Sequence, residues 1–90
     1  MGQIIRIHQA LRHLTNNQSA VEVDGKTVGK CLAELVERFP GMKPKLFGTN
    51  GKLLSYVDIY VNAESSYPEE LDKAVNDGDT LSVTIIIAGG

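Results

Sequence analysis

A change of hydrophobic period between residues 20 and 39 constrains the fold more than any other feature of this sequence. Over residues 20–24, Val21 and Val23 alternate with charged neighbours, which is the pattern of a half-buried strand. From Val28 onward the apolar residues follow helical spacing instead. They lie at i, i+3, i+4, i+7, i+8 and i+11, as Val28, Cys31, Leu32, Leu35, Val36 and Phe39. The two periods predict a strand followed by one amphipathic helix of about three turns.

Residues on both sides of this apolar stripe predict where the helix begins and ends. Thr27 can cap the first turn through its side-chain oxygen, and Pro40-Gly41 is expected to end the helix. Closer to the N-terminus, β-branched residues predict a strand over residues 4–8. This strand is expected to pair with residues 20–24 across a turn at residues 15–18, where short amide side chains favour local backbone bonds.

The second half of the chain predicts two further strands. In residues 56–61 the apolar Val57, Ile59 and Val61 alternate with more polar neighbours. Residues 68–75 predict a short helical or turn segment that inserts Leu71 into the core. The turn Asp77-Gly78-Asp79 then leads into a last strand. The inner face of that strand is predicted to consist of Leu81, Val83, Ile85 and Ile87.

The order strand, strand, helix, strand, strand predicts an α+β fold in which a mixed sheet packs on one main helix. The β-grasp, or ubiquitin-like, architecture has this arrangement, with the last strand parallel to the first. A chain of 90 residues with 42% hydrophobic content is enough for one core. We expect that core to contain Val28, Leu32, Leu35, Val36, Ile59, Leu71, Val83 and Ile85.

The sequence stops at Gly89-Gly90, directly after the last predicted strand. Glycine has no Cβ, so we expect residues 1–87 to form the domain and residues 88–90 a flexible tail thin enough to enter a narrow enzyme channel. The tail would present the carboxylate of Gly90. A carboxylate becomes a good acyl donor when ATP converts it to an acyl-adenylate, from which sulfide, a thiol or an amine can displace AMP. The hypothesis is that the C-terminus itself is the substrate of another enzyme.

Composition argues against several other classes of protein. The net charge of -2 offers no basic surface for nucleic acid, and the apolar runs are far shorter than the roughly 18–20 residues that span a bilayer. Cys31 is the single cysteine, so an intramolecular disulfide is excluded and a reducing cytoplasm is the expected location. Because Cys31 lies on the apolar stripe, we expect it to be buried and inert, without a zinc site. His8 and His13 are expected at the surface without a chemical role.

Three motifs in this order resemble the ubiquitin-like sulfur carriers of the MoaD/ThiS type. They are Val61-Asn62, Asp77-Gly78-Asp79 about fifteen positions later, and a strand closing on Ala88-Gly89-Gly90. The resemblance covers nearly the whole chain. It is strongest to the branch that carries sulfur for cysteine synthesis, with the molybdopterin synthase small subunit next. Residues 84–88 differ from the phenylalanine and proline-rich ending of the molybdopterin carriers.

The resemblance implies a carrier rather than an enzyme, with no cofactor bound to the chain. A partner adenylating enzyme would use ATP and a sulfur donor to convert the Gly90 carboxylate to a thiocarboxylate, recognising Ala88 and Gly89 on the way. The sulfur would then pass to a cysteine synthase or to the large subunit of molybdopterin synthase. Two alternatives stay open. The chain could modify lysine amines of other proteins, or it could be an interaction module whose diglycine has no chemical role.

A candidate partner interface lies on the strand face opposite the helix. The alternation predicts that Tyr56, Tyr60, Thr84 and Ile86 share this face, close to the tail. Branched apolar and aromatic side chains are preferred anchors at protein interfaces, but they also occur scattered over ordinary surfaces. A group of carboxylates is either solvated or faces a basic groove of the activating enzyme. Its members are Glu69, Glu70, Asp72, Asp77 and Asp79.

Overall fold

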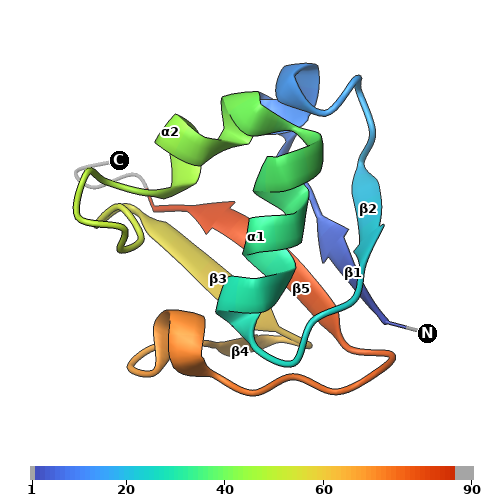
Figure 1. The fold of residues 1–90 in the computed structure, drawn as a ribbon, viewed down its shortest axis with the longest axis vertical. Coiled ribbons are helices and arrows are strands. Elements are labelled where there is room, and N and C mark those ends of the chain that lie inside the picture. Colours follow the sequence, from blue (N-terminus) through green and yellow to red (C-terminus); the bar gives the residue numbers. More distant parts are fainter. Residues whose placement is uncertain (1, 87–90) are drawn as a thin grey trace.

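A five-stranded mixed sheet with one long helix across a single face makes up the computed structural model, which describes residues 2–86 (Figure 1). The strand order is β2-β1-β5-β3-β4. β1 and β5 are parallel, whereas the other neighbouring strands are antiparallel. The strands are β1 (Gln3–Arg6), β2 (Ala20–Val23), β3 (Val57–Val61), β4 (Glu64–Ser65) and β5 (Thr80–Ile85). The parallel pairing of the first and last strands confirms the predicted topology.

The main helix α1 (Val28–Arg38) begins where the sequence predicts. Thr27 is extended, and its Oγ1 accepts a 3.1 Å hydrogen bond from the backbone N–H of Lys30, which satisfies one of the unpaired donors of the first turn. The helix buries Val28, Cys31, Leu32 and Leu35 against the sheet. The apolar stripe therefore forms the buried face of an amphipathic helix, as its period predicts, and this face covers one face of the sheet.

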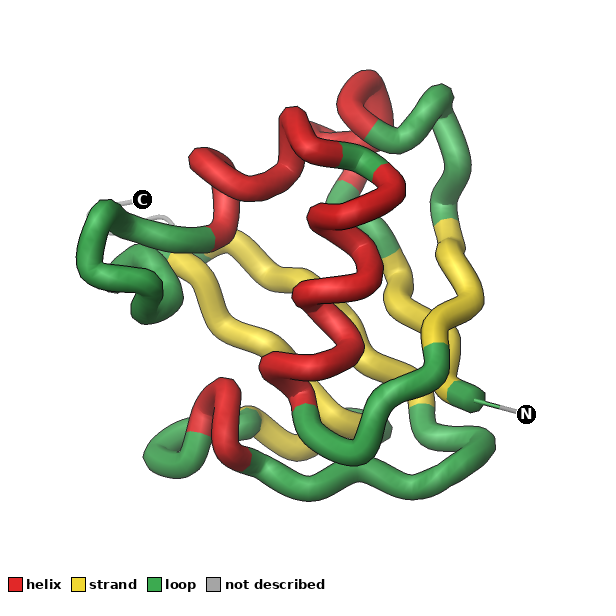
Figure 2. Tube along the Cα trace, viewed as in Figure 1, coloured by secondary structure: helices red, strands yellow, loops and turns green. Residues whose placement is uncertain are grey.

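Five short elements connect these parts, and the sequence did not predict most of them. Four are helical, and they lie on the same side of the molecule as α1 or at its ends (Figure 2). The fifth, β4, forms a tight hairpin with β3. The helical elements are η1 (Gln9–Leu14), η2 (Pro40–Met42), α2 (Lys43–Leu46) and η3 (Glu70–Asp72), of which η3 matches the predicted helical or turn segment.

One predicted boundary was wrong and another was confirmed. The first strand was expected over residues 4–8 but ends at Arg6, because His8 Nδ1 accepts a 3.0 Å bond from the N–H of Ala10 and starts η1. Pro40-Gly41 was expected to end the main helix, and α1 does end at Arg38. In addition, Pro40 opens the next helical turn, η2, where its fixed φ is favourable.

The core contains the predicted residues and several others. Val28, Leu32, Leu35, Ile59 and Val83 are buried, and Val36, Leu71 and Ile85 are half-buried and pack against them. Met42 of η2 and Leu46 of α2 are fully buried too, and the sequence predicted neither of these two helical elements. Ile87, which was predicted to continue this face, lies outside the described residues.

The turn at residues 77–79 has the predicted form. Gly78 has φ +89°, a conformation that favours glycine because it has no Cβ, and the N–H of Gly78 donates a 2.7 Å bond to Gly2 O. The turn therefore places the start of β5 beside β1. Within the described residues, no helix is long and apolar enough to cross a membrane.

Candidate docking face and C-terminal segment

The carboxylate of Gly90, which is the predicted reactive group, comes after Ile86, the last described residue, in the sequence. Ala88, Gly89 and Gly90, which were predicted to form the recognised tail and its reactive carboxylate, lie outside the described residues. The described part of the site is therefore the sheet surface that leads to this segment, built from β3 and β5.

Strand register brings the predicted interface residues onto one face. Ser82 of β5 lies opposite Tyr60 of β3, and Thr84 lies opposite Asp58. Beyond the end of β5, the N–H of Ile86 donates a 2.7 Å hydrogen bond to the backbone oxygen of Tyr56. Because side chains alternate along a strand and the intervening residues are buried under α1, these side chains lie on the outer face.

The most exposed part of this face is at Tyr56 and at Ile86, the last described residue. Ile86 is 53% exposed and Tyr56 is 48% exposed, whereas Tyr60 and Thr84 are half-buried. Large apolar side chains at this exposure are available to a partner protein. We use the name outer patch for Tyr56, Tyr60, Ser82, Thr84 and Ile86. The structure places all of them together, and their role in docking stays a prediction.

The predicted interface left out a carboxylate in the middle of the outer patch. Asp58 follows the same strand alternation as Tyr56 and Tyr60, which was the available signal. Its Oδ2 accepts a 2.7 Å hydrogen bond from Ser65 Oγ, and its backbone oxygen accepts a 2.9 Å bond from Thr84 Oγ1. The outer patch therefore has an ordered acidic group between its two tyrosines.

The neighbouring strand β1 extends the same face. Arg6 lies opposite Ser82 across the parallel pairing of β1 and β5, and Ile4, which is 43% exposed, lies opposite Thr80. The face therefore combines apolar side chains with one cationic and one anionic group. Such a combination suits specific docking, because the charges penalise partners that do not complement them.

A groove of about 500 Å³ adjoins the outer patch at Ile86. Tyr67, which is 73% exposed, lies along it. Its lining combines apolar walls with two carboxylates, and consists of Leu53, Leu54, Ser55, Val57, Asp58, Ser65, Tyr67, Glu70 and Ile86. A partner that covers the outer patch would reach this groove as well.

The remaining candidate reactive residues, Cys31, His8 and His13, lie outside the outer patch. Cys31 is fully buried, and its thiol donates a 3.3 Å hydrogen bond to Gln3 Oε1. Burial raises the pKa of Cys31 to about 11, which keeps the thiol protonated and unreactive at neutral pH. His8 caps η1, and His13 is exposed. In residues 2–86 no three His, Cys, Asp or Glu side chains are grouped so that they could hold a metal ion.

The acidic residues near β5 have more than one environment. Asp79 is held in hydrogen bonds, because its Oδ1 accepts from Asn62 Nδ2 at 3.0 Å and its Oδ2 from the N–H of Asn76 at 2.9 Å. These bonds lower the pKa of Asp79. In contrast, Glu69, Asp72 and Asp77 are exposed. Asp79 is therefore part of the turn, and the others are available to solvent or to a basic partner.

Comparison with known proteins gives consistent results for sequence and structure. Residues 5–90 match the model of the ThiS family. Sulfur carrier protein CysO of Mycobacterium tuberculosis is 32% identical over 93 residues, covering 100% of both chains. Small archaeal modifier protein 1 of Haloferax volcanii is 34% identical over 71 residues, covering 78% of each. A chain in the crystal structure of the Amycolatopsis orientalis BexX/CysO complex has a TM-score of 0.89 and 32% identity, covering 99% of this chain and 100% of that chain.

Proposed function

Because this chain belongs to the ThiS family of ubiquitin-like sulfur carriers, we propose that it carries sulfur as a thiocarboxylate on Gly90. The observation that supports this most is the similarity to sulfur carrier protein CysO, which covers 100% of both chains, together with Gly89-Gly90 in this sequence. The chain acts as a carrier and is itself the substrate of another protein's chemistry.

The proposed chemistry has two steps on the carboxylate. An adenylating enzyme joins a carboxylate oxygen of Gly90 to the α-phosphate of ATP and releases pyrophosphate. Sulfide, or a persulfide donor together with a reductant, then attacks the acyl carbon and displaces AMP, so that sulfur replaces one oxygen. ATP and the sulfur donor are cosubstrates of that enzyme and not groups held by this chain. A thiocarboxylate keeps the sulfur nucleophilic while preventing its diffusion.

The outer patch gives both partners a surface to recognise. The adenylating enzyme must hold the domain while the tail enters its active site. Ile86 is the last described residue before that tail in the sequence, and its N–H is bonded to the backbone oxygen of Tyr56. The complex of CysO with BexX from Amycolatopsis orientalis supports docking of this chain onto a partner protein, and we propose that the enzyme accepting the sulfur docks in this way. We propose a cysteine synthase as that acceptor, with the large subunit of molybdopterin synthase as the second candidate, because the full-length similarity is to CysO.

Modification of other proteins is the competing function. The similarity to small archaeal modifier protein 1 favours it, since the same adenylated Gly90 would form an amide when a lysine amine displaces AMP. The products differ in a measurable way. A carrier accumulates as a thiocarboxylate, whereas a modifier is found in isopeptide bonds to other proteins.

Intact-protein mass spectrometry tests the proposal. The full-length chain, incubated with its adenylating enzyme, ATP and sulfide, should gain the mass difference between sulfur and oxygen. A chain lacking Gly90 and a chain with one alanine added after Gly90 should not gain it, because neither places a glycine carboxylate at the same distance from the domain. An unchanged wild-type mass, with an enzyme shown to bind the chain, would reject the carrier proposal. Lysine conjugates without any thiocarboxylate would favour the modifier.

A further inference from the structure

Within residues 2–86, the strand β2 is at the edge of the sheet, so one side of its backbone has no neighbouring strand there. The N–H of Ile7 donates to Ser19 O, and the same register pairs Ile5 with Val21. Hydrogen-bonded pairs alternate along an antiparallel ladder, so the backbone groups of Ala20, Glu22 and Asp24 point away from β1. Exposed groups of this kind are a template on which another strand can add.

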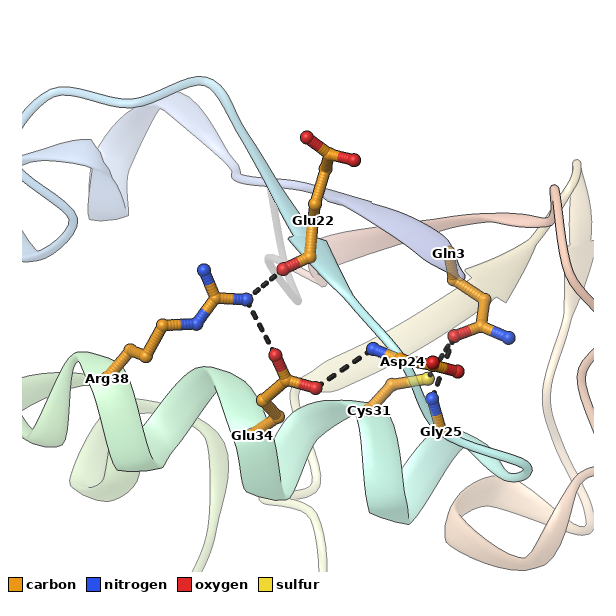
Figure 3. A network of polar contacts seen from close by, with 7 residues as sticks. All are labelled: Gln3, Glu22, Asp24, Gly25, Cys31, Glu34 and Arg38. Carbon is orange, nitrogen blue, oxygen red and sulfur yellow. Dashed lines mark hydrogen bonds and ion pairs between the residues drawn. The ribbon is translucent and has the colours of Figure 1, made fainter. Parts of the chain in front are cut away.

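Two side chains of α1 occupy this edge (Figure 3). The guanidinium of Arg38 donates to the backbone oxygen of Glu22, and Glu34 Oε1 accepts a 2.9 Å hydrogen bond from the N–H of Asp24. Glu34 and Arg38 are also joined to each other by a 2.9 Å ion pair one helical turn apart. The two side chains thus form a closed bridge over the C-terminal end of the β2 edge.

The bridge makes the same hydrogen bonds to β2 that an added parallel strand would make. In a parallel sheet, one residue of the added strand donates to the carbonyl of residue i−1 and accepts from the N–H of residue i+1 of its neighbour. On the two sides of Val23, Arg38 donates to the carbonyl of Glu22 and Glu34 accepts from the N–H of Asp24. We infer that this ion pair substitutes for a neighbouring strand and closes the β2 edge against pairing with a second copy of this chain.

The start of α1 is held at the same edge by a buried polar contact. The side chain of Gln3 is almost completely buried, and its Oε1 accepts from the N–H of Gly25 at 3.0 Å and from Cys31 Sγ at 3.3 Å (Figure 3). This contact links β1 to the turn before α1 and to the helix itself. It therefore sets the position from which Glu34 and Arg38 reach β2.

A second copy is the occupant that fits the edge once it is opened. Two β2 strands related by a two-fold axis pair antiparallel. Pairing centred on Val21 places Ala20 of each copy opposite Glu22 of the other, so no like charges meet. This register uses the carbonyl of Glu22, which Arg38 occupies in the structure. The inference does not depend on the proposed sulfur chemistry.

Hydrogen exchange tests the bridge in the full-length protein. Replacing Glu34 with alanine should make the Asp24 amide exchange roughly tenfold faster or more, since its charged acceptor is lost. Glu37→Ala is the matched control, because Glu37 is exposed on the same helix and makes no side-chain bond to β2. An unchanged Asp24 exchange rate in Glu34→Ala would reject the bridge.

Sedimentation tests the closed edge. Wild type and Glu37→Ala should be monomeric, whereas the double variant Glu34→Ala with Arg38→Ala should form concentration-dependent dimers. Adding Glu22→Pro to the double variant removes the outward N–H that a second copy needs, and should restore the monomer. Circular dichroism would verify that each variant is folded. A folded double variant that stays monomeric, a dimeric wild type, or a dimer that persists with Glu22→Pro would each overturn the inference.

Discussion

Asn62 donates a 3.0 Å hydrogen bond from Nδ2 to Oδ1 of Asp79, and this contact joins the turn after β3 to the turn before β5. The other half of the Asn62 amide accepts a 2.9 Å bond from the N–H of Thr80. The two residues belong to two of the motifs by which the sequence resembles the sulfur carriers. The spacing between these two motifs thus has a structural reason. Asn62 satisfies the N–H of Thr80 and Asp79 satisfies the N–H of Asn76, so both residues hold the backbone where β5 begins.

Asp79→Asn should make stability at low pH less dependent on pH. Bonds from the N–H of Asn76 and the amide of Asn62 lower the pKa of Asp79 below its ordinary value of 3.8. The charged form is therefore stabilised by folding, so this contribution is present above pH 3.8 and is lost as pH falls through the folded-state pKa. Thermal unfolding should show a lower Tm for the variant at neutral pH and a narrowing difference below pH 3.8. Two results would contradict a stabilising role for the charged Asp79 carboxylate. One is a Tm difference between variant and wild type that does not change with pH, and the other is an equally large Tm difference for Asp77→Asn.

Leu35→Ala should lower the free energy of unfolding by about 2–5 kcal/mol, because it leaves a cavity where α1 packs on the sheet. Leu35 is fully buried. Urea denaturation measures the change, and Glu37→Ala on the exposed side of the same helix should alter it by less than about 0.5 kcal/mol. Equal effects of the two substitutions would show that Leu35 contributes no more packing than a surface residue.

The double substitution Ile86→Asp and Tyr60→Asp should weaken binding to the adenylating enzyme by roughly tenfold or more, since apolar anchors at the centre of an interface carry most of its energy. Both side chains lie on the outer patch and outside the buried core. Ala33→Asp, an exposed position on α1, adds a carboxylate on the other side of the sheet and should leave the affinity unchanged. Calorimetric titration measures it, and an unaltered Kd for the folded double variant would remove the outer patch from the docking model.

Cys31 should resist alkylation in the folded protein. Burial raises the pKa of its thiol to about 11 from an ordinary value of 9.0, so the thiolate is scarce at neutral pH and inaccessible as well. Because the folded state favours the protonated thiol, the contribution of Cys31 to the stability of the fold is complete below pH 9.0. This contribution is lost as pH rises toward about 11. Mass spectrometry after iodoacetamide treatment should show reaction only in urea, whereas a cysteine introduced by Glu37→Cys should react in buffer. Rapid labelling of Cys31 in the native chain would argue against its buried position.

The sequence predicted those parts of the fold whose signal is local. The period of 3.6 residues identified α1 and its buried face, and Thr27 marked where it begins. The period of two residues identified β3 and the side of it that carries Tyr60. These patterns are readable because burial on one side of an element leaves a repeat in consecutive residues. The pairing of β1 with β5 was predicted by analogy with the β-grasp architecture, whose order of elements this sequence matches.

Tertiary structure alone decided the contacts between residues far apart in the chain. Asp58 became the charged centre of the outer patch because Ser65 and Thr84 reach it from two other strands. Arg38 meets the edge of β2 because α1 crosses the sheet at that place. α2 has only four residues, too few to show a period, and its helical state depends on burying Leu46. Local patterns record which face of each element is buried, whereas the position of one element on another depends on the packing of the whole core.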